Sequence, residues 1–382
     1  MRILHTADWH LGRIFHNIHL TDEQAYVLDE LVTLAKEARP DVVVVAGDVY
    51  DRAVPPPEAV SLLDEVLTRL ALDCRVPVIV IAGNHDSPER LGFGERVLAR
   101  QKVHVVGALS GELASVVLAD EHGPVYFCPL PYAEPAVVRE RLGTGTASHE
   151  QAMAAMVARA TATVPAGARK VAVAHAFVTG GVGSESERPL AVGGVPTVSG
   201  AVFAGFDYVA LGHLHKAQQV AGPNVRYAGS LLKYSFAEAA HRKAVALVEL
   251  DGAGLARVEE VSLTPRRDVR TVEGYLAEVL AAGEKDSRAD DYIAVTLKDS
   301  GAIFDAMGKL RRVYPNVLQV GRAELAAASL TEGRADHRRQ SEAELFAAFF
   351  LQATGQALSE AEAAAAARLM DEYRRREREV GA

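Results

Sequence analysis

The sequence predicts an α/β protein in which two β-sheets pack together. Short, nearly unbroken runs of β-branched residues recur along the chain, and such runs are typical of strands that are buried on both faces. Helical patterns separate the first three runs, which gives a βαβαβ order. Alternating apolar and polar segments follow, separated by Gly, Pro and Asn, and these indicate antiparallel strands. Together the three observations predict layers of helices and sheets around a large core.

Each element is assigned from its own pattern. The buried-strand runs lie at 3–4, 42–46, 78–82, 171–174 and 208–211. The helical patterns lie at 22–38 and 58–70, and both are long enough to connect parallel strands. We expect a second sheet that packs against the first and is built from alternating segments at 114–120, 124–130, 225–230, 243–250 and 256–263. The polar, glycine-rich residues 180–194 predict a surface loop.

The pattern changes after residue 265. One helix (272–282), one strand (292–297), another helix (302–313) and another strand (317–320) follow, and this alternation predicts a small separate domain. Two further helices are expected at 342–353 and 360–379. We therefore predict a main domain at 1–265, a cap at 266–328, and a linker with C-terminal helices at 329–382.

Length and composition limit the possible functions. The 382 residues predict about two domains, and 49% hydrophobic with 24% charged residues exclude disorder as the dominant state. The balance of 41 basic against 50 acidic residues gives a net charge of −9, so binding to a polyanion cannot depend on bulk positive charge. Cys74 and Cys128 form no CxxC pair, and no apolar run reaches the roughly 18–20 residues of a membrane span. We expect a cytoplasmic protein with no membrane span.

Polar side chains follow five of the predicted strands. In α/β sheets, ligands bind in the crevice beyond the carboxyl ends of the strands, so these side chains should meet. A single buried His is more often a hydrogen-bonded core residue, and Gly-Asp alone is usually a turn. The whole set instead favours a metal centre, because uncompensated buried charges would cost several kcal/mol each. Its members are Asp8, His10, Asp48, Asn84, His85, His175, His213 and His215.

These residues lie in motifs that resemble a known family. DWHLG at 8–12, GDVYDR at 47–52, GNHD at 83–86, His175 and GHLH at 212–215 resemble the ordered signature of calcineurin-like metallophosphoesterases. GDVYDRAVPP and GNHDSPERLGF are more similar still to the SbcD family, the nuclease subunits of bacterial SbcC–SbcD complexes. The resemblance covers residues 8–215, and the later segments fit it more loosely. It implies a two-sheet αββα sandwich with a small α/β cap and C-terminal helices.

The resemblance also implies roles for individual residues. His85 would stabilise the transition state or protonate the leaving oxygen, and Asp51 would orient His85 and keep it protonated; alternatively, Asp51 only caps a turn. Mn²⁺ suits the imidazole and carboxylate ligands best in this family, with Fe or Zn as alternatives. The two metal sites that it implies, with Asp48 as the bridge, are Asp8, His10, Asp48 and His215, and Asp48, Asn84, His175 and His213.

The resemblance implies a Mn²⁺-dependent DNA phosphodiesterase that acts in repair, recombination and replication, as a double-strand exonuclease and a single-strand and hairpin endonuclease. The same kind of site serves enzymes that act on small phosphodiesters or phosphoproteins, and a metal-free scaffold is a third reading. No phosphate-cradling loop for ATP occurs in the sequence, so ATP would act through a partner. The resemblance names an SbcC-like ATPase subunit, with the chain as a homodimer within a heterotetramer on DNA.

The two C-terminal helices carry apolar stripes. Such helices either pack on the protein's own cap or dock onto another chain. Because the pair is terminal, short and joined by a polar linker, we expect it to dock onto the SbcC-like partner. The stripes consist of Leu345, Phe346, Phe349 and Phe350 in the first helix and Leu369, Met370 and Tyr373 in the second.

Overall fold

A computed structural model describes residues 1–188, 190, 197–301, 303–323, 342–354 and 356–380. The chain divides into two units, Met1–Arg266 and Arg267–Ala382. The expected linker at 329–341 lies outside the described residues, as do positions 324–328 of the expected cap. In the parts of the chain that are described, no helix combines the length and the apolar composition needed to cross a membrane.

The first sheet of the first unit has six strands in the order β16-β15-β1-β4-β5-β6. Strands β1, β4, β5 and β6 are parallel to one another. Strand β15 pairs antiparallel with β1, and β16 pairs antiparallel with β15. As the sequence predicted, helices α1 (Thr21–Ala38) and α2 (Pro57–Thr68) connect the first parallel strands. The strand bounds are β1 Arg2–Thr6, β4 Val42–Ala46, β5 Val78–Ile81, β6 Val103–Val106, β15 Ala244–Asp251 and β16 Gly254–Ser262.

The second sheet also has six strands, in the order β13-β14-β12-β9-β8-β7. The four central strands are parallel, and only the two outer strands are antiparallel to their neighbours. Helices α5 (Pro135–Leu142) and α6 (His149–Thr161) pack on its outer face through a core that includes Val138, Met153 and Met156. The strand bounds are β7 Val116–Asp120, β8 Gly123–Leu130, β9 Arg169–His175, β12 Tyr208–Gly212, β13 Gln218–Gln219 and β14 Val225–Tyr227.

Contrary to the expectation from sequence, the alternating segments do not form one antiparallel second sheet. Segments 243–250 and 256–263 become β15 and β16 of the first sheet, whereas 124–130 and 225–230 pair in parallel with β9 and β12. Alternation shows that one face of a strand is buried, but it carries no information about which neighbour the strand pairs with. In β15, Ala246, Val248 and Leu250 point into the core between the sheets, which is compatible with either sheet.

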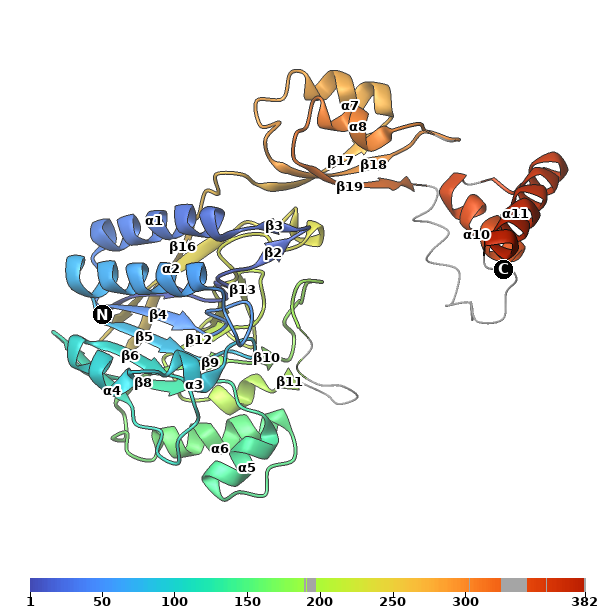
Figure 1. The fold of residues 1–382 in the computed structure, drawn as a ribbon. Helices are drawn as coiled ribbons and strands as arrows, with labels where there is room; N and C mark the ends of the chain where they lie inside the picture. The colour runs from blue at the N-terminus through green and yellow to red at the C-terminus, as the bar shows by residue number, and fades with distance from the viewer. Residues whose placement is uncertain (189, 191–196, 302, 324–341, 355, 381–382) are drawn as a thin grey trace. The chain divides into compact units, whose positions relative to one another are not determined.

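The two sheets pack face to face over a continuous apolar core. Val44 and Ile79 of the first sheet lie in the same cluster as Phe127, Val173 and Tyr208 of the second, and all five are fully buried. Figure 1 shows α1 and α2 together on one side of the sheets and α5 and α6 on the opposite side. The predicted αββα sandwich is therefore confirmed. Because the sheets face each other, the carboxyl ends of β1, β4, β5, β9 and β12 lie at one edge of the sandwich.

The second unit contains three parallel strands, β17 (Val269–Gly274), β18 (Tyr292–Leu297) and β19 (Val317–Arg322), with helices α7 (Leu276–Gly283) and α8 (Ala306–Arg311). The helix that we expected at 272–282 begins later, because Val269, Thr271 and Val272 extend a β-branched strand that pairs with β18. The last helices are α10 (Glu342–Thr354) and α11 (Glu360–Val380), close to their expected bounds.

Candidate metal centre

The candidate ligands come together at the shared edge of the two sheets. They lie directly after β1, β4, β5 and β12 or at the end of β9, so both sheets contribute. All are buried except Asn84, which is half-buried. The residues concerned are Asp8, His10, Asp48, Asn84, His175, His213 and His215.

Asp48 belongs to two groups of possible ligands at once. The ligand atoms of Asp8, His10 and Asp48 lie within 4.8 Å of one another, and those of Asp48, His175 and His213 do the same. Asp48 Oδ2 is 3.7 Å from His10 Nε2 and 3.4 Å from His175 Nε2. A carboxylate that lies between two imidazole rings is suited to bridge two adjacent cations.

The remaining two candidates complete these groups. Asn84 Oδ1 lies 2.9 Å from His175 Nε2 and 3.2 Å from His213 Nδ1. His215 Nε2 lies 3.0 Å from His10 Nε2, and two ring nitrogens at this distance need a proton or a cation between their lone pairs.

The donor atoms fit divalent cations. Asp8 Oδ2 is buried and has no hydrogen-bond partner among the residues that the structure describes. Buried polar atoms of this kind need a partner, and a bound cation supplies one. Imidazole, carboxylate and amide donors without thiolate match cations such as Mn²⁺, Fe²⁺ and Zn²⁺.

The main chain at the strand ends is bent into a left-handed conformation that non-glycine residues seldom adopt. The φ angles are +52° at Asp8, +47° at His10, +48° at Asp48 and +109° at His213. Hydrogen bonds hold these turns, since His213 N–H donates to Asp8 Oδ1 and His85 N–H donates to Asp48 Oδ1, both at 2.9 Å. Strain of this kind is common at functional sites, where the surrounding structure must hold it in place.

Two glycines of the motifs are required by close packing. A Cβ atom on Gly83 would lie 2.1 Å from Asp48 Oδ1, and one on Gly212 would lie 1.9 Å from the carbonyl oxygen of Ala46. No side chain can be accommodated at either position without moving the strand ends. Gly212 therefore allows the two sheets to approach closely, and Gly83 allows the loops that follow β4 and β5 to do so.

The buried carboxylates and imidazoles perturb one another's pKa values in opposite directions. Burial raises the pKa of Asp8 to about 7, although the imidazole of His175 opposes the rise. Burial also disfavours the charged form of Asp48, but the imidazoles of His175 and His10 hold its pKa well below the usual range. Burial lowers the pKa of His213 well below that of free imidazole. Such opposed shifts are typical of functional sites, and a neutral imidazole can act as a ligand.

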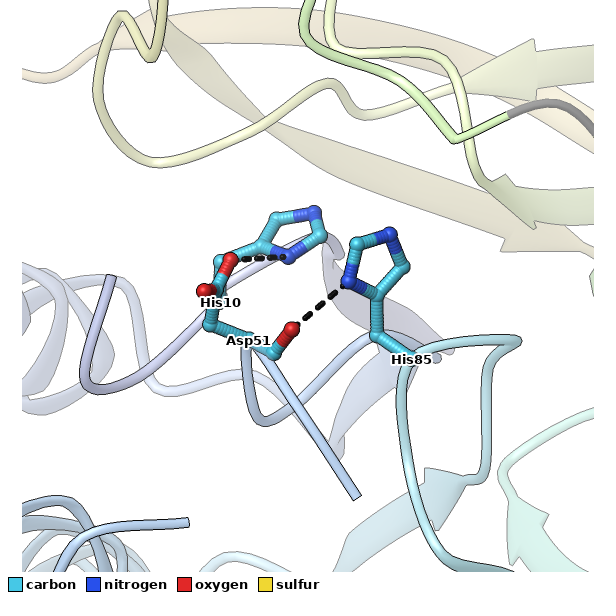
Figure 2. Close-up of side chains that lie close together, drawn as sticks. All are labelled: His10, Asp51 and His85. Carbon is cyan, nitrogen blue, oxygen red and sulfur yellow. Dashed lines mark hydrogen bonds and ion pairs between the residues drawn. The ribbon is translucent and has the colours of Figure 1, made fainter. Parts of the chain in front are cut away.

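His85 and Asp51 are in contact through the main chain of Asp51 (Figure 2). His85 Nδ1 lies 2.7 Å from the main-chain carbonyl oxygen of Asp51, and a carbonyl only accepts, so Nδ1 carries a proton. The Asp51 carboxylate lies instead 2.8 Å from Arg13 Nη1 and 3.5 Å from His10 Nδ1. An oxygen of this carboxylate also lies within 4.8 Å of a His85 ring nitrogen. That Asp51 orients His85 therefore stays a prediction, with the main-chain carbonyl as the hydrogen-bond partner. Burial lowers the pKa of His85, and Asp48 opposes the shift.

Asp86, the last residue of the GNHD motif, has a role that we did not predict. Its buried carboxylate accepts hydrogen bonds from the main-chain N–H groups of Val49 (3.1 Å), Tyr50 (2.8 Å) and Gly83 (2.9 Å). These bonds fasten the loop after β4 to the loop after β5, so Asp86 fixes the position of Asp48. The GNHD motif could have indicated this role, because a carboxylate that is buried at such a position needs hydrogen-bond donors around it.

Other supporting residues carry no local sequence signal. Gln24 of α1 donates from Nε2 to the carbonyl oxygens of Trp9 (3.1 Å) and His10 (2.7 Å), and its Oε1 accepts from Gly12 N–H (3.0 Å). Its position in an ordinary amphipathic helix gives no indication of this contact. The same is true of three residues that surround His215, namely Ser186, Glu238 and Lys243.

Comparison with known protein families agrees with this geometry. Residues 1–138 match the calcineurin-like phosphoesterase family. This match indicates a metal-dependent phosphoester hydrolase and includes Asp8, His10, Asp48, Asn84 and His85. The three remaining candidate ligands lie beyond the matched residues of the phosphoesterase domain, and strands β9 and β12 bring them to the site. Residues 265–354 match the "Type 5 capsule protein repressor C-terminal domain" family, which bears the label SbcD_C.

Solved structures similar to this chain include three proteins of low sequence identity. The protein TT1561 of Thermus thermophilus is 15% identical, over 68% of this chain and 98% of that protein, with a TM-score of 0.38. A dimetal phosphatase from Danio rerio is 16% identical, over 69% and 99%, with a TM-score of 0.40. GAP50, the anchor in the inner membrane complex of Plasmodium, is 11% identical, over 84% and 96%, with a TM-score of 0.35.

Proposed function

We propose that this protein is a Mn²⁺-dependent DNA phosphodiesterase that acts as a double-strand exonuclease and as an endonuclease on single strands and hairpins. The observation that carries the proposal is the position of Asp48, which two groups of buried ligands share. The SbcD_C match at 265–354 supports DNA as the substrate, because that label belongs to the nuclease family that the motifs resemble. DNA repair, recombination and replication in the cytoplasm are the processes that this assignment implies.

The residues present could hold two cations. Asp8, His10 and His215 would hold one, Asn84, His175 and His213 the other, and Asp48 would contact both. When bound, two divalent cations polarise the phosphoryl group, activate water and stabilise both the attacking and the leaving oxygen.

His85 would act on the leaving group. Its Nδ1 proton is held by the Asp51 carbonyl oxygen, and its Nε2 lies 4.0 Å from Asp48 Oδ2 and therefore faces the site. A proton taken up at Nε2 can be passed to the 3′ oxygen as the phosphodiester bond breaks, which is general acid catalysis. The main-chain contact keeps the ring in this orientation whatever the charge of the Asp51 carboxylate.

The nuclease assignment is tested by offering the purified protein several phosphoesters. With Mn²⁺, we expect cleavage of a DNA duplex, a DNA hairpin and bis-p-nitrophenyl phosphate, and loss of all three activities on chelation. A cyclic nucleotide and a phosphopeptide should remain uncleaved. Hydrolysis of the phosphopeptide or the small diester without cleavage of DNA would favour the alternative phosphoesterase function.

We also propose that α10 and α11 dock onto an SbcC-like ATPase, with the 266–328 segment contacting DNA and two copies of the chain in a heterotetramer. Phe349 of α10 is 63% exposed and Leu369 of α11 is 67% exposed, so apolar side chains of the expected stripes are available to a partner. The side chains of Leu345 and Tyr373 lie outside the described residues. An exposed apolar stripe on a helix is suited to a hydrophobic groove on another protein.

Docking can be tested without disturbing the catalytic domain. Removal of residues 330–382 should leave hydrolysis of bis-p-nitrophenyl phosphate unchanged and abolish co-purification with an SbcC-like ATPase. The substitution Phe349→Glu should weaken the complex, whereas Phe304→Glu, which changes an 89% exposed phenylalanine outside the stripe, should not. A complex that survives the truncation would refute docking by these helices.

A further inference from the structure

His215 is surrounded by polar groups that come from segments outside the motifs. Ser186 Oγ lies 2.7 Å from His215 Nδ1, and the same hydroxyl donates a hydrogen bond to Glu238 Oε1. Glu238 Oε1 is itself 3.4 Å from His215 Nδ1. The serine hydroxyl therefore lies between the imidazole and a carboxylate, and these two residues are 29 and 23 positions away from His215 in the sequence.

The direction of each hydrogen bond follows from the chemistry of the groups. An ionised carboxylate can only accept hydrogen bonds, so the Ser186 hydroxyl donates its hydrogen bond to Glu238. The lone pair of Ser186 Oγ is then directed at His215 Nδ1, which must carry a proton. The other ring nitrogen, Nε2, is left unprotonated and lies 3.0 Å from His10 Nε2, on the side of the candidate metal centre.

Lys243 holds Glu238 in its ionised form. Its ammonium group forms an ion pair with Glu238 Oε2 and donates to the His215 carbonyl oxygen and to Ser230 Oγ, both at 2.8 Å. Glu238 and Lys243 are both buried.

The loop that carries Ser186 also holds the main chain of His215. The His215 N–H donates to Glu187 Oε1 at 2.8 Å, and Glu187 follows Ser186 in the loop. The loop thus contacts His215 at both its ring and its main chain. No other candidate ligand in the described residues has its ring hydrogen-bonded to a side chain from this loop.

We propose that Ser186 and Glu238 are positioning residues for His215: they fix the tautomer in which Nε2 is free to bind a cation, and so set the affinity of the half of the metal centre that contains His10. The inference rests on the proposed function, since the cation is the group that Nε2 would bind. Partners of this kind around a metal-binding histidine change metal affinity by about 10–100-fold in other proteins.

Ser186 is the position that separates positioning from stability. The buried pair of Glu238 and Lys243 would matter for folding whatever its effect on His215, because removal of one member leaves a buried charge. Ser186→Ala removes only the hydroxyl and leaves that pair intact. Ser184→Ala is the matched control, because Ser184 lies in the same loop and its buried hydroxyl has no hydrogen-bond partner among the described residues.

The test measures the histidine tautomer and the metal affinity separately, in the full-length chain. In metal-free protein labelled with ¹⁵N in histidine, the His215 signals are identified by their loss in His215→Asn. We expect the Nδ1-protonated tautomer in the wild type and Ser184→Ala, and a mixture of tautomers in Ser186→Ala. In equilibrium dialysis with Mn²⁺, one of two sites should weaken about 10–100-fold in Ser186→Ala. Ser186→Thr, which restores a hydroxyl, should recover most of the loss.

Two results would overturn the inference: an unchanged tautomer in Ser186→Ala, or two Mn²⁺ sites of undiminished affinity in that variant. Failure of the proposed function looks different. If the wild type itself bound no Mn²⁺, the phosphodiesterase proposal would fall, and the tautomer measured in metal-free protein would still decide whether Ser186 positions His215.

Discussion

The two halves of the candidate metal centre are supported in different ways. In the Asn84 half (Asn84, His175 and His213), His175 Nδ1 donates to the carbonyl oxygen of Ala46 at 3.0 Å, so the end of strand β4 orients the ring. In the His10 half (Asp8, His10 and His215), the His215 ring depends on side chains of a loop and a distant segment. The His175 ring is oriented by a main-chain carbonyl of the facing sheet, and the His215 ring by side chains that a single substitution can remove.

The difference indicates which ligand orientations are insensitive to substitution. A main-chain carbonyl at a strand end is present whatever the side chain, so the support of His175 survives most substitutions. The support of His215 does not, because it requires a hydroxyl, a carboxylate and an ammonium group in contact. We therefore expect substitutions around the centre to affect the His10 half more often than the Asn84 half.

The largest effect is expected from Asp48→Ala, because Asp48 is common to both halves. Metal content should fall from two ions per chain towards none, and hydrolysis of bis-p-nitrophenyl phosphate should fall by more than the roughly 10²–10³-fold lost with a single electrostatic donor. Elemental analysis after dialysis checks the first expectation and a colorimetric assay the second. Asp64→Ala, which removes an exposed carboxylate of α2, is the control. Retention of one tightly bound ion would show that the halves are independent.

The substitution His85→Gln should lower activity about 10²–10⁴-fold, the usual contribution of a general acid. Metal content should stay near two ions per chain, because His85 belongs to neither half. Cleavage of a DNA duplex and elemental analysis test the two statements on the same preparation. Full activity in His85→Gln would show that the ring has no catalytic role.

A smaller effect is expected from Asp51→Asn, which changes the carboxylate and keeps the main-chain carbonyl that contacts His85. Activity should fall less than about 10-fold, well short of the loss expected for a missing general acid. The weakened contact with Arg13 costs little, because both side chains are partly exposed. Steady-state kinetics beside those of His85→Gln decide the matter: equal losses would mean that the carboxylate, and not the carbonyl, controls His85.

The smallest effect near neutral pH concerns His5, which links the strands that lead to the two halves. His5 of β1 contacts Tyr208 Oη at 2.9 Å and the Leu211 carbonyl oxygen of β12 at 3.2 Å. Burial lowers its pKa from 6.5 to about 3. Between these values the unfolded chain binds more protons than the folded chain, so this contribution to stability is complete above pH 6.5. It is lost as the pH falls, at about 1.4 kcal/mol per pH unit.

Urea unfolding at pH 7, 6 and 5, followed by the fluorescence of Trp9, measures this dependence in the first unit. Trp9 is the only tryptophan of the chain and is fully buried. In His5→Leu the free energy of unfolding should vary less steeply with pH, and the difference in slope is the test because the substitution also changes absolute stability. Identical slopes would show that folding leaves the pKa of His5 unchanged.

The sequence was most informative where a local pattern and a position coincide. Asp48 and Asn84 could be placed because unbroken β-branched runs end directly before them, so the strand end and the ligand are read from the same few residues. The sheet to which 243–250 belongs could not be predicted, because alternation indicates a buried face without naming a neighbour. Ser186 and Glu238 could not be found either, because their contact with His215 depends on the path of the chain between them.

The position of β15 beside β1 has a consequence for synthesis of the protein. Arg2 pairs with Glu249 and His5 with Ala246, so during synthesis β1 lacks one of its neighbours until β15, which follows more than 200 residues later, has been made. Pairing between such distant segments is slow, because a long loop must close before the contact forms. Asp8 and His10 follow this strand directly. A nascent chain therefore cannot complete the candidate metal centre until the first unit is almost fully translated.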